Sequence, residues 1–163
     1  MQKRFIIIAL FLTISFQTEL FFSSLNSAIT TKTHIELTDG KTGRKIFSEA
    51  LQNGETIILT WNNSLFRLKV TEVFIVRDGL LEQTSVTFAD PKGGIPPAVK
   101  SEDVDDLYHT GGAFKAEGLS RPIRKVVYRV GEIGDPVIKI GNRIIRLAKE
   151  VGFGGSVILE VLK

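Results

Sequence analysis

Hydrophobic and polar residues alternate along most of the chain after residue 32, in short runs rich in Val, Ile, Thr and Phe. Such alternation is typical of β-strands, because successive side chains of a strand point to opposite faces of the sheet. It predicts about nine short strands. They lie at residues 33–37, 44–47, 56–61, 66–76, 81–88, 125–130, 137–140, 143–147 and 156–162.

Turn-forming pairs separate these runs. Asp78-Gly79 and Gly141-Asn142 each lie between two alternating runs and predict β-hairpins, because both pairs are well suited to a positive φ. Helical periodicity is confined to residues 146–151, before Gly152. The sequence therefore predicts one all-β domain at residues 30–163, an antiparallel β-sandwich or a partly open β-barrel. Either architecture hides sheet faces and limits free edges.

The longest segment without a strand pattern runs from Asp90 to Gly118. It begins with a Gly- and Pro-rich stretch, which does not suit the interior of a sheet. Its middle is acidic, but the acids lack the spacing and the glycine of an EF-hand loop. The pattern predicts a solvated loop and no metal site, with calcium binding as the alternative.

Glu72 interrupts an apolar strand face. The face otherwise consists of Phe66, Leu68, Val70, Phe74 and Val76. Either a β-bulge near position 71 turns the carboxylate outward, or Glu72 is buried and needs a cationic or hydrogen-bonding partner.

A second interruption is the polar triplet at residues 62–64. Because Asn accepts a positive φ easily, the triplet predicts a tight turn between two strands. The alternative is a continuous strand in which Trp61, Asn63 or Ser64 line a small polar pocket. Ser64 and Glu72 share a site only if the chain folds back between them.

The first 28 residues resemble a targeting segment. Two basic residues, Lys3 and Arg4, precede an apolar run at residues 5–16, as in a secretory signal peptide. The polar residues that follow make the run short for a membrane-spanning helix. We expect a signal peptide or an uncleaved N-terminal membrane anchor at residues 1–28. Either places residues 30–163 outside the cytoplasm, in the periplasm or at the cell surface.

Composition narrows the chemistry. The chain of 163 residues has no cysteine, which excludes disulfides, thiolate metal sites and a cysteine nucleophile. A net charge of +3 gives little support to a nucleic-acid partner. His34 and His109 lie in distant segments, and no catalytic motif is present. We expect a binding domain without a cofactor. A hydrolase using Ser64 or Asp90 with Glu72, and a structural sandwich without a ligand, are the alternatives.

Four segments together resemble a known family. They are WNNSLFRLKVTEVF, FADPKGGIPP, RPIRKVVYRVG and VGFGGSVILEV, and they cover about residues 50–162. Their order resembles the uncharacterised family of small extracytoplasmic domains that accompanies TAXI-type TRAP transporters. The resemblance implies an extracytoplasmic location and, as a partner, a TRAP permease or its solute receptor. It implies no reaction.

Several residues match the family motifs and others depart from them. Ser64 and Glu72 match the first motif, and Arg129, Val130 and Gly131 match the third. In the second motif the matches are Phe88, Gly94, Ile95 and Pro96. Family histidines and a serine are replaced by Asn63, Pro136 and Asp90, which removes any chemistry that depends on imidazole.

These observations define the candidate residues. Glu72 and Arg129 are predicted to form a buried structural ion pair, because each is a lone charge in an apolar run. The candidate ligand or partner contacts are Trp61, Asn63, Ser64, Asp90, Gly93, Gly94 and Pro96.

Overall fold

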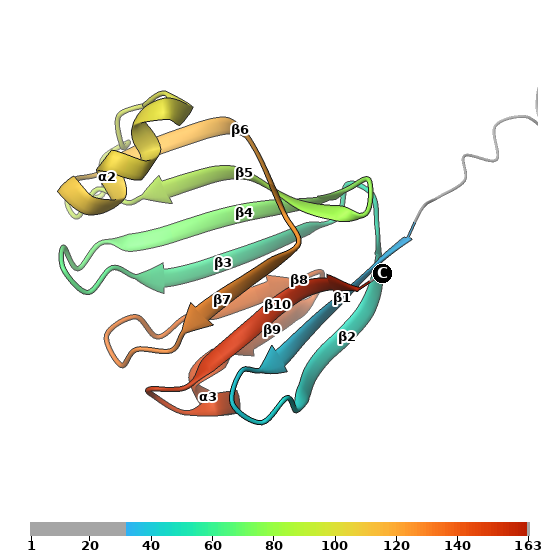
Figure 1. Ribbon diagram of the computed structural model, residues 1–163. Coiled ribbons are helices and arrows are strands. Elements are labelled where there is room, and N and C mark those ends of the chain that lie inside the picture. The colour runs from blue at the N-terminus through green and yellow to red at the C-terminus, as the bar shows by residue number, and fades with distance from the viewer. Residues whose placement is uncertain (1–31, 163) are drawn as a thin grey trace, which may run out of the picture. The chain divides into compact units, whose positions relative to one another are not determined.

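The computed structural model describes residues 32–162, which fold into two antiparallel β-sheets (Figure 1). Sheet A has the order β2 (Lys45–Gln52), β1 (Lys32–Asp39), β10 (Ser156–Leu162) and β7 (Lys125–Arg129). Sheet B has the order β6 (Phe114–Ile123), β5 (Leu80–Phe88), β4 (Lys69–Arg77), β3 (Thr56–Asn62), β8 (Val137–Ile140) and β9 (Arg143–Arg146). The predicted all-β sandwich is confirmed, with ten strands. The expected N-terminal targeting segment lies outside the described residues.

Local sequence determines both predicted hairpins. Asp78 and Gly79 connect β4 to β5, and both have a positive φ, of 49° and 75°. Gly141 and Asn142 connect β8 to β9, where Gly141 alone has a positive φ. Glycine and aspartate tolerate this backbone region, so each pair reverses the chain in two residues.

Residues 90–118 contain more regular structure than a solvated loop. A 3₁₀ turn, η1 (Ser101–Asp103), leads into the helix α2 (Val104–Thr110), and β6 begins at Phe114. Glu102 and Asp103 are exposed on η1, and Asp105 and Asp106 are exposed on α2. Asp105 pairs with Arg121 at 2.8 Å. The short helix α3 (Leu147–Val151) forms where the helical pattern predicted it. None of the helices in residues 32–162 is long and apolar enough to cross a membrane.

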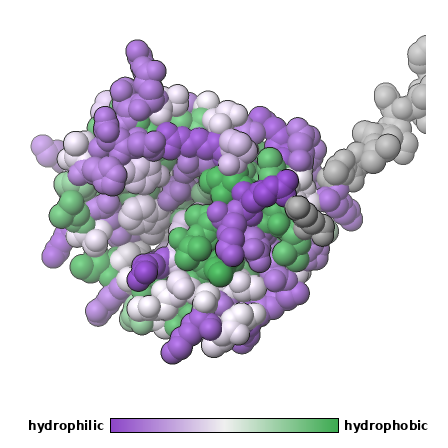
Figure 2. All heavy atoms as spheres, in the orientation of Figure 1, coloured by the Kyte–Doolittle hydropathy of each residue, from purple (hydrophilic) through white to green (hydrophobic). Residues whose placement is uncertain are grey.

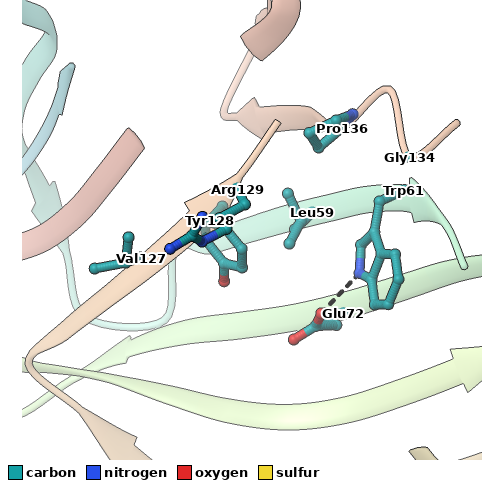
Figure 3. Close-up of a pocket in the computed structure, with 8 residues that line it drawn as sticks. All are labelled: Leu59, Trp61, Glu72, Val127, Tyr128, Arg129, Gly134 and Pro136. Atoms are coloured by element: carbon teal, nitrogen blue, oxygen red, sulfur yellow. Dashed lines mark hydrogen bonds between the residues drawn. The ribbon is translucent and has the colours of Figure 1, made fainter. Parts of the chain in front are cut away.

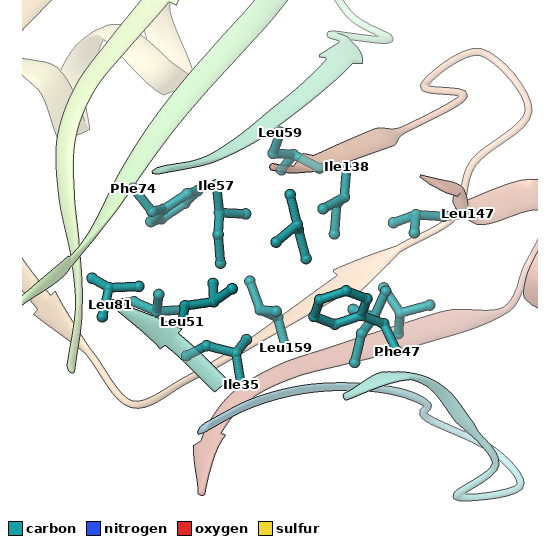
Figure 4. Close-up of a cluster of buried hydrophobic side chains, with 14 of the residues drawn as sticks. Ile35, Phe47, Leu51, Ile57, Leu59, Phe74, Leu81, Ile138, Leu147 and Leu159 are labelled. Carbon is teal, nitrogen blue, oxygen red and sulfur yellow. The ribbon is translucent and has the colours of Figure 1, made fainter. Parts of the chain in front are cut away.

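Two apolar clusters form the core. The first lies between the sheets and includes Ile35, Leu59, Phe74 and Leu159 (Figure 4). The second lies beneath α2, where buried residues of β4, β5 and β6 pack with Val104. Sheet B is thus covered by sheet A over one part and by α2 over another. Trp61 is partly buried and packs against both clusters.

One extended segment passes from one sheet to the other. Strand β6 belongs to sheet B and β7 to sheet A, and only Arg124 separates them. In Figure 1 this segment crosses from the upper sheet to the lower sheet, and β7 ends at the edge of sheet A. Hydrophobic surface gathers over β7 and β10 in the face shown in Figure 2. Val127 of β7 contributes, with 55% of its surface exposed.

Candidate functional site

Glu72 is a buried carboxylate that is held by two neutral donors. Its exposed fraction is 9%. The indole Nε1–H of Trp61 donates to Oε1 at 2.8 Å, and the amide Nε2–H of Gln83 donates to Oε2, also at 2.8 Å. The three side chains come from β3, β4 and β5, three adjacent strands of sheet B. The interpretation of Glu72 as buried with hydrogen-bonding partners is therefore confirmed.

A turn at residues 63–68 brings Trp61 to Glu72. Asn63 closes the turn, because its N–H donates to the carbonyl of Leu68 at 2.8 Å and its Oδ1 accepts the N–H of Phe66 at 2.9 Å. Strand β4 then pairs antiparallel with β3, with Leu59 opposite Glu72 and Trp61 opposite Val70. Trp61 and Glu72 are diagonal neighbours on one face, within reach of a long side chain. The predicted turn is confirmed.

A β-bulge in β5 brings Gln83 to the same face. Ser85 pairs with Val73 and Gln83 pairs with Phe74, so Thr84 is an extra residue with no opposite partner in β4. An extra residue reverses the in-and-out alternation of the strand. Gln83 therefore faces the core beside Glu72. The bulge lies in the strand next to β4, not near Thr71.

An inter-sheet cavity of about 190 Å³ opens beside this network (Figure 3). It is lined by residues of β3, β4, β7 and the segment that follows β7, namely Leu59, Trp61, Glu72, Val127, Tyr128, Arg129, Gly134 and Pro136. The Tyr128 hydroxyl is buried and has no hydrogen-bond partner. Most buried polar groups are hydrogen-bonded, so this hydroxyl is an exception that needs an explanation. The cavity combines apolar walls with a carboxylate and an unsatisfied hydroxyl.

Burial controls the ionisation of the acidic groups here. Loss of hydration raises the pKa of Glu72, although the hydrogen bonds from Trp61 and Gln83 counteract the shift. Burial also raises the pKa of Tyr128, and the negative charge of Glu72 raises it further. The same two causes raise the pKa of Tyr108, which α2 contributes. Both phenols are therefore neutral near pH 7.

A second, outer cavity of about 410 Å³ adjoins the first. Trp61, Arg129 and Gly134 line both cavities, and Ser64 lines only the outer one. The predicted ion pair between Glu72 and Arg129 is not formed within residues 32–162, where no salt bridge joins the two side chains. Arg129 is exposed on the edge strand β7, so its charge remains hydrated while Glu72 bonds to neutral donors.

The Gly-rich loop that contains the remaining candidates lies away from both cavities. Asp90 organises it, because its Oδ1 accepts the N–H of Lys92 at 2.9 Å and its carbonyl accepts the N–H of Gly93 at 2.9 Å. A Cβ on Gly94 would collide with Oδ2 of Asp90, so a larger residue there would require the Asp90 side chain to move. Pro96 follows Ile95, which is 94% exposed. Asp90, Gly93, Gly94 and Pro96 line neither cavity.

The structure thus brings together some predicted residues and adds others. Trp61 and Ser64 line the cavities, whereas Asn63 shapes the turn between β3 and β4. Sequence reasoning missed Gln83 and Tyr128 as site residues. Gln83 is a polar residue that follows the buried Leu81 and Glu82, which could have indicated it. The direction of the Gln83 side chain, however, depends on the bulge. Pro136 also lines the inter-sheet cavity.

The acidic residues and the candidate hydrolytic residues are dispersed over the part of the chain that the structure describes. No group of three or more His, Cys, Asp and Glu within residues 32–162 is arranged to hold a metal ion. Ser64, Glu72 and Asp90 do not converge, since they occupy the outer cavity, the inter-sheet cavity and a separate loop. Comparisons of the chain with protein-family models, with curated proteins and with solved structures found no match.

Proposed function

We propose that this protein is an extracytoplasmic binding domain that admits a small organic molecule to the inter-sheet cavity and serves as an accessory to a TAXI-type TRAP transporter. The observation that carries the binding role is the Tyr128 hydroxyl, which is buried beside Glu72 without a partner. A buried polar group without a partner is costly, and a ligand in the cavity would satisfy it. The unpaired Tyr128 hydroxyl lowers the stability of the fold, as groups in binding sites commonly do.

The transporter association rests on the family resemblance. Positions from separate motifs lie around the two cavities: Glu72 and Pro136 line the inner one, Ser64 and Gly131 line the outer one, and Arg129 lines both. Motif residues that meet in space, although they are distant in sequence, favour a shared site. The targeting pattern at residues 3–16 supports the extracytoplasmic location.

The described residues around Ser64 do not support a hydrolytic role for it. A serine nucleophile needs an adjacent base. The Glu72 carboxylate lines the inter-sheet cavity, whereas Ser64 lines only the outer one, and Asp90 holds its own loop. The same dispersal leaves binding as the function that the cavity suits best.

Ligand binding can be tested by NMR, because the chain has one tryptophan and it lines both cavities. A library of small organic cations, anions and neutral molecules is added to the full-length protein while the Trp61 indole N–H resonance is followed. We expect a saturable shift with at least one class. If no class shifts the resonance, the binding role is contradicted.

Two glycine variants locate the ligand. Gly134 lines both cavities, and a Cβ there would make only ordinary van der Waals contacts, the shortest at 3.6 Å. We expect Gly134→Leu to fold and to block binding. Gly131→Leu is the matched control, since Gly131 lines only the outer cavity. Equal binding by both variants would place the ligand elsewhere.

The transporter association has a separate test. Tagged full-length protein is purified from the membranes of its native host, with an unrelated exported protein carrying the same tag as the control. We expect a TRAP permease or a TRAP solute receptor to co-purify, identified by mass spectrometry. If neither is recovered while a known membrane complex stays intact, the association is wrong and the binding role stands on the NMR result alone.

A further inference from the structure

We propose that the ligand of the inter-sheet cavity is a small organic cation, with its positive nitrogen held between the Glu72 carboxylate, the Tyr128 hydroxyl and the Trp61 ring. This inference rests on the proposed binding role and names the class of ligand. The cavity of about 190 Å³ is below the usual size of drug-binding pockets, so the ligand is small.

The carboxylate supplies the first argument. Among residues 32–162, Glu72 is the only acidic residue that lines the cavity, and both of its hydrogen-bond donors are neutral. An ionised carboxylate offers about four acceptor positions, of which the indole and the amide occupy two. A buried negative charge without a cationic partner is unfavourable. An ammonium group would compensate that charge and use the free acceptor positions.

The aromatic residues supply the second argument. Trp61 and Tyr128 both line the cavity, from β3 and β7 respectively (Figure 3). Cations bind favourably to the faces of aromatic rings, and most strongly to tryptophan. The Tyr128 oxygen can also accept a hydrogen bond from an ammonium N–H, which would satisfy the orphaned hydroxyl.

Anionic and neutral ligands suit the cavity less well. An anion would lie next to buried Glu72, whose negative charge is weakly screened, whereas the positive charge of exposed Arg129 is screened by solvent. A neutral molecule would leave the carboxylate without charge compensation. The arrangement therefore selects a positive group at the base of the cavity, and Arg129 leaves room for a neutral or acidic group at its rim.

Binding of a cation is coupled to ionisation of Glu72. The titratable or charged groups around it are Tyr128 and Arg129 of β7 and Tyr108 of α2. The phenols are neutral near pH 7, because burial raises the pKa of both, so the acid whose charge changes is Glu72. Protonation of Glu72 removes the attraction. Cation affinity is therefore expected to fall as pH decreases through the raised pKa of Glu72, with proton release on binding.

Three probes of matched length test the ligand class: butylammonium, 1-butanol and butyrate. Each is titrated into the full-length protein while Trp61 fluorescence is recorded, which is specific because the chain has one tryptophan. We expect butylammonium to bind at least about tenfold more tightly than either of the other probes, as one compensated charge allows. Its affinity is expected to decline at low pH.

Variants identify the groups responsible. Glu72→Gln is expected to abolish the preference for butylammonium, and Tyr128→Phe to weaken its binding about threefold. Glu132→Gln is the charge-matched control, because Glu132 lines only the outer cavity and is exposed. It should change the affinity less than about twofold. If Glu72→Gln does not fold, the wild-type pH profile and Tyr128→Phe decide the question.

The outcomes separate the two proposals. If 1-butanol or butyrate binds as tightly as butylammonium, the cation inference is overturned and the binding role stands. If the preference for butylammonium survives in Glu72→Gln, the inference is also overturned. If none of the probes alters Trp61 fluorescence, the cation inference fails, and the NMR screen then decides whether the binding role fails with it.

Discussion

The ionised form of Glu72 is destabilised in the folded protein, because burial removes the carboxylate from water and its donors carry no charge. Its pKa is raised above the ordinary value of 4.5. The folded protein therefore keeps this proton at a pH where the unfolded chain has lost it. It follows that the free energy of unfolding decreases as pH rises from about 4.5 through the raised pKa, and is constant above it.

Glu72→Gln should remove this decrease. The variant keeps an oxygen that can accept the Trp61 N–H but has no carboxylate to ionise. We expect it to be at least as stable as the wild type near pH 7, by about 1.4 kcal/mol for each unit of pKa shift that is abolished. Urea unfolding of both proteins between about pH 4 and pH 8 measures the difference.

The same measurement decides between two accounts of Glu72. If a buried ion pair with Arg129 existed, Glu72→Gln would lose several kcal/mol near pH 7. A large loss of stability in the variant would therefore contradict the hydrogen-bonded arrangement. The exposed pair Glu102 and Lys100 offers a control, since Glu102→Gln removes the same charge from the surface and should change stability near pH 7 by less than about 1 kcal/mol.

Tyr128→Phe is expected to stabilise the protein while weakening ligand binding. The change removes a buried hydroxyl that has no partner, and such a group costs about 1–3 kcal/mol. We expect the free energy of unfolding to rise by about 1 kcal/mol, measured by urea unfolding without ligand. Thr33→Val is the matched control, because the Thr33 hydroxyl is also buried and unpaired but lines neither cavity.

The opposite responses of stability and binding would mark the Tyr128 hydroxyl as functional. Thr33→Val should also raise stability and leave butylammonium binding unchanged. If Tyr128→Phe instead lowers stability by more than about 1 kcal/mol, the hydroxyl has a hydrogen-bond partner in the folded protein. The proposed role of this hydroxyl in ligand binding would then be contradicted.

At the scale of elements, the bulge at Thr84 sets the position of the site. Deletion of Thr84 would restore regular alternation along β5 and leave Gln83, Val86 and Phe88 on one face, because Thr84 is the extra residue between Gln83 and Ser85. We therefore expect the deletion to keep the bond between Gln83 and Glu72. The Trp61 indole N–H resonance, which reports on the network, and urea unfolding measure the effect.

Thr84→Val provides the control for this deletion. It keeps the extra residue and removes only a hydroxyl that bonds weakly, at 3.3 Å, to the carbonyl of Val73. The variant should differ from the wild type by less than about 1 kcal/mol. A deletion mutant that lost the wild-type Trp61 resonance would contradict the account of Thr84 as the extra residue of the bulge.

Elements that depend on local sequence could be predicted, and those that depend on distant contacts could not. Asp78-Gly79 reverses the chain by its own backbone preference, so this hairpin can be predicted from the sequence. Period-two alternation identified the buried face of β4, including Glu72. In β5, by contrast, a bulge changes the phase of the alternation at one residue. No residue pattern around Thr84 predicts this bulge.

Helix α2 illustrates the other limit. Its seven residues include Asp105 and Asp106, which have low helix propensity, so the segment reads as a loop. Short helices are stabilised mainly by tertiary packing. Val104 is fully buried in the second apolar cluster, and Leu107 and Tyr108 pack against that cluster. Only the surface offered by β4, β5 and β6 makes this segment helical.

At the scale of the molecule, the two apolar clusters predict regions of different stability. Val104→Ala should loosen α2 selectively, because Val104 is its one fully buried residue. We expect faster amide hydrogen exchange in residues 101–110 and a stability loss of about 2 kcal/mol for that region. Exchange in β1 and β10, which contribute to the cluster between the sheets, should be unchanged.

Asp106→Ala, an exposed change on the same helix, is the control for that experiment. If Val104→Ala accelerated exchange in β1 and β10 to the same extent as in α2, the two clusters would form one cooperative unit. Selective loosening would instead mean that α2 can open without disrupting the sandwich.

The strand order also determines when the domain can fold. Strand β10, the last in the chain, lies between β1 and β7, while β1, the first, lies between β2 and β10. The middle of sheet A therefore cannot form until residues 156–162 have been synthesised, and its pairing joins segments far apart in sequence, which is slow. A chain that still lacks residues 156–162 could pair β1 with β2 and form sheet B, but it could not place β7 in sheet A.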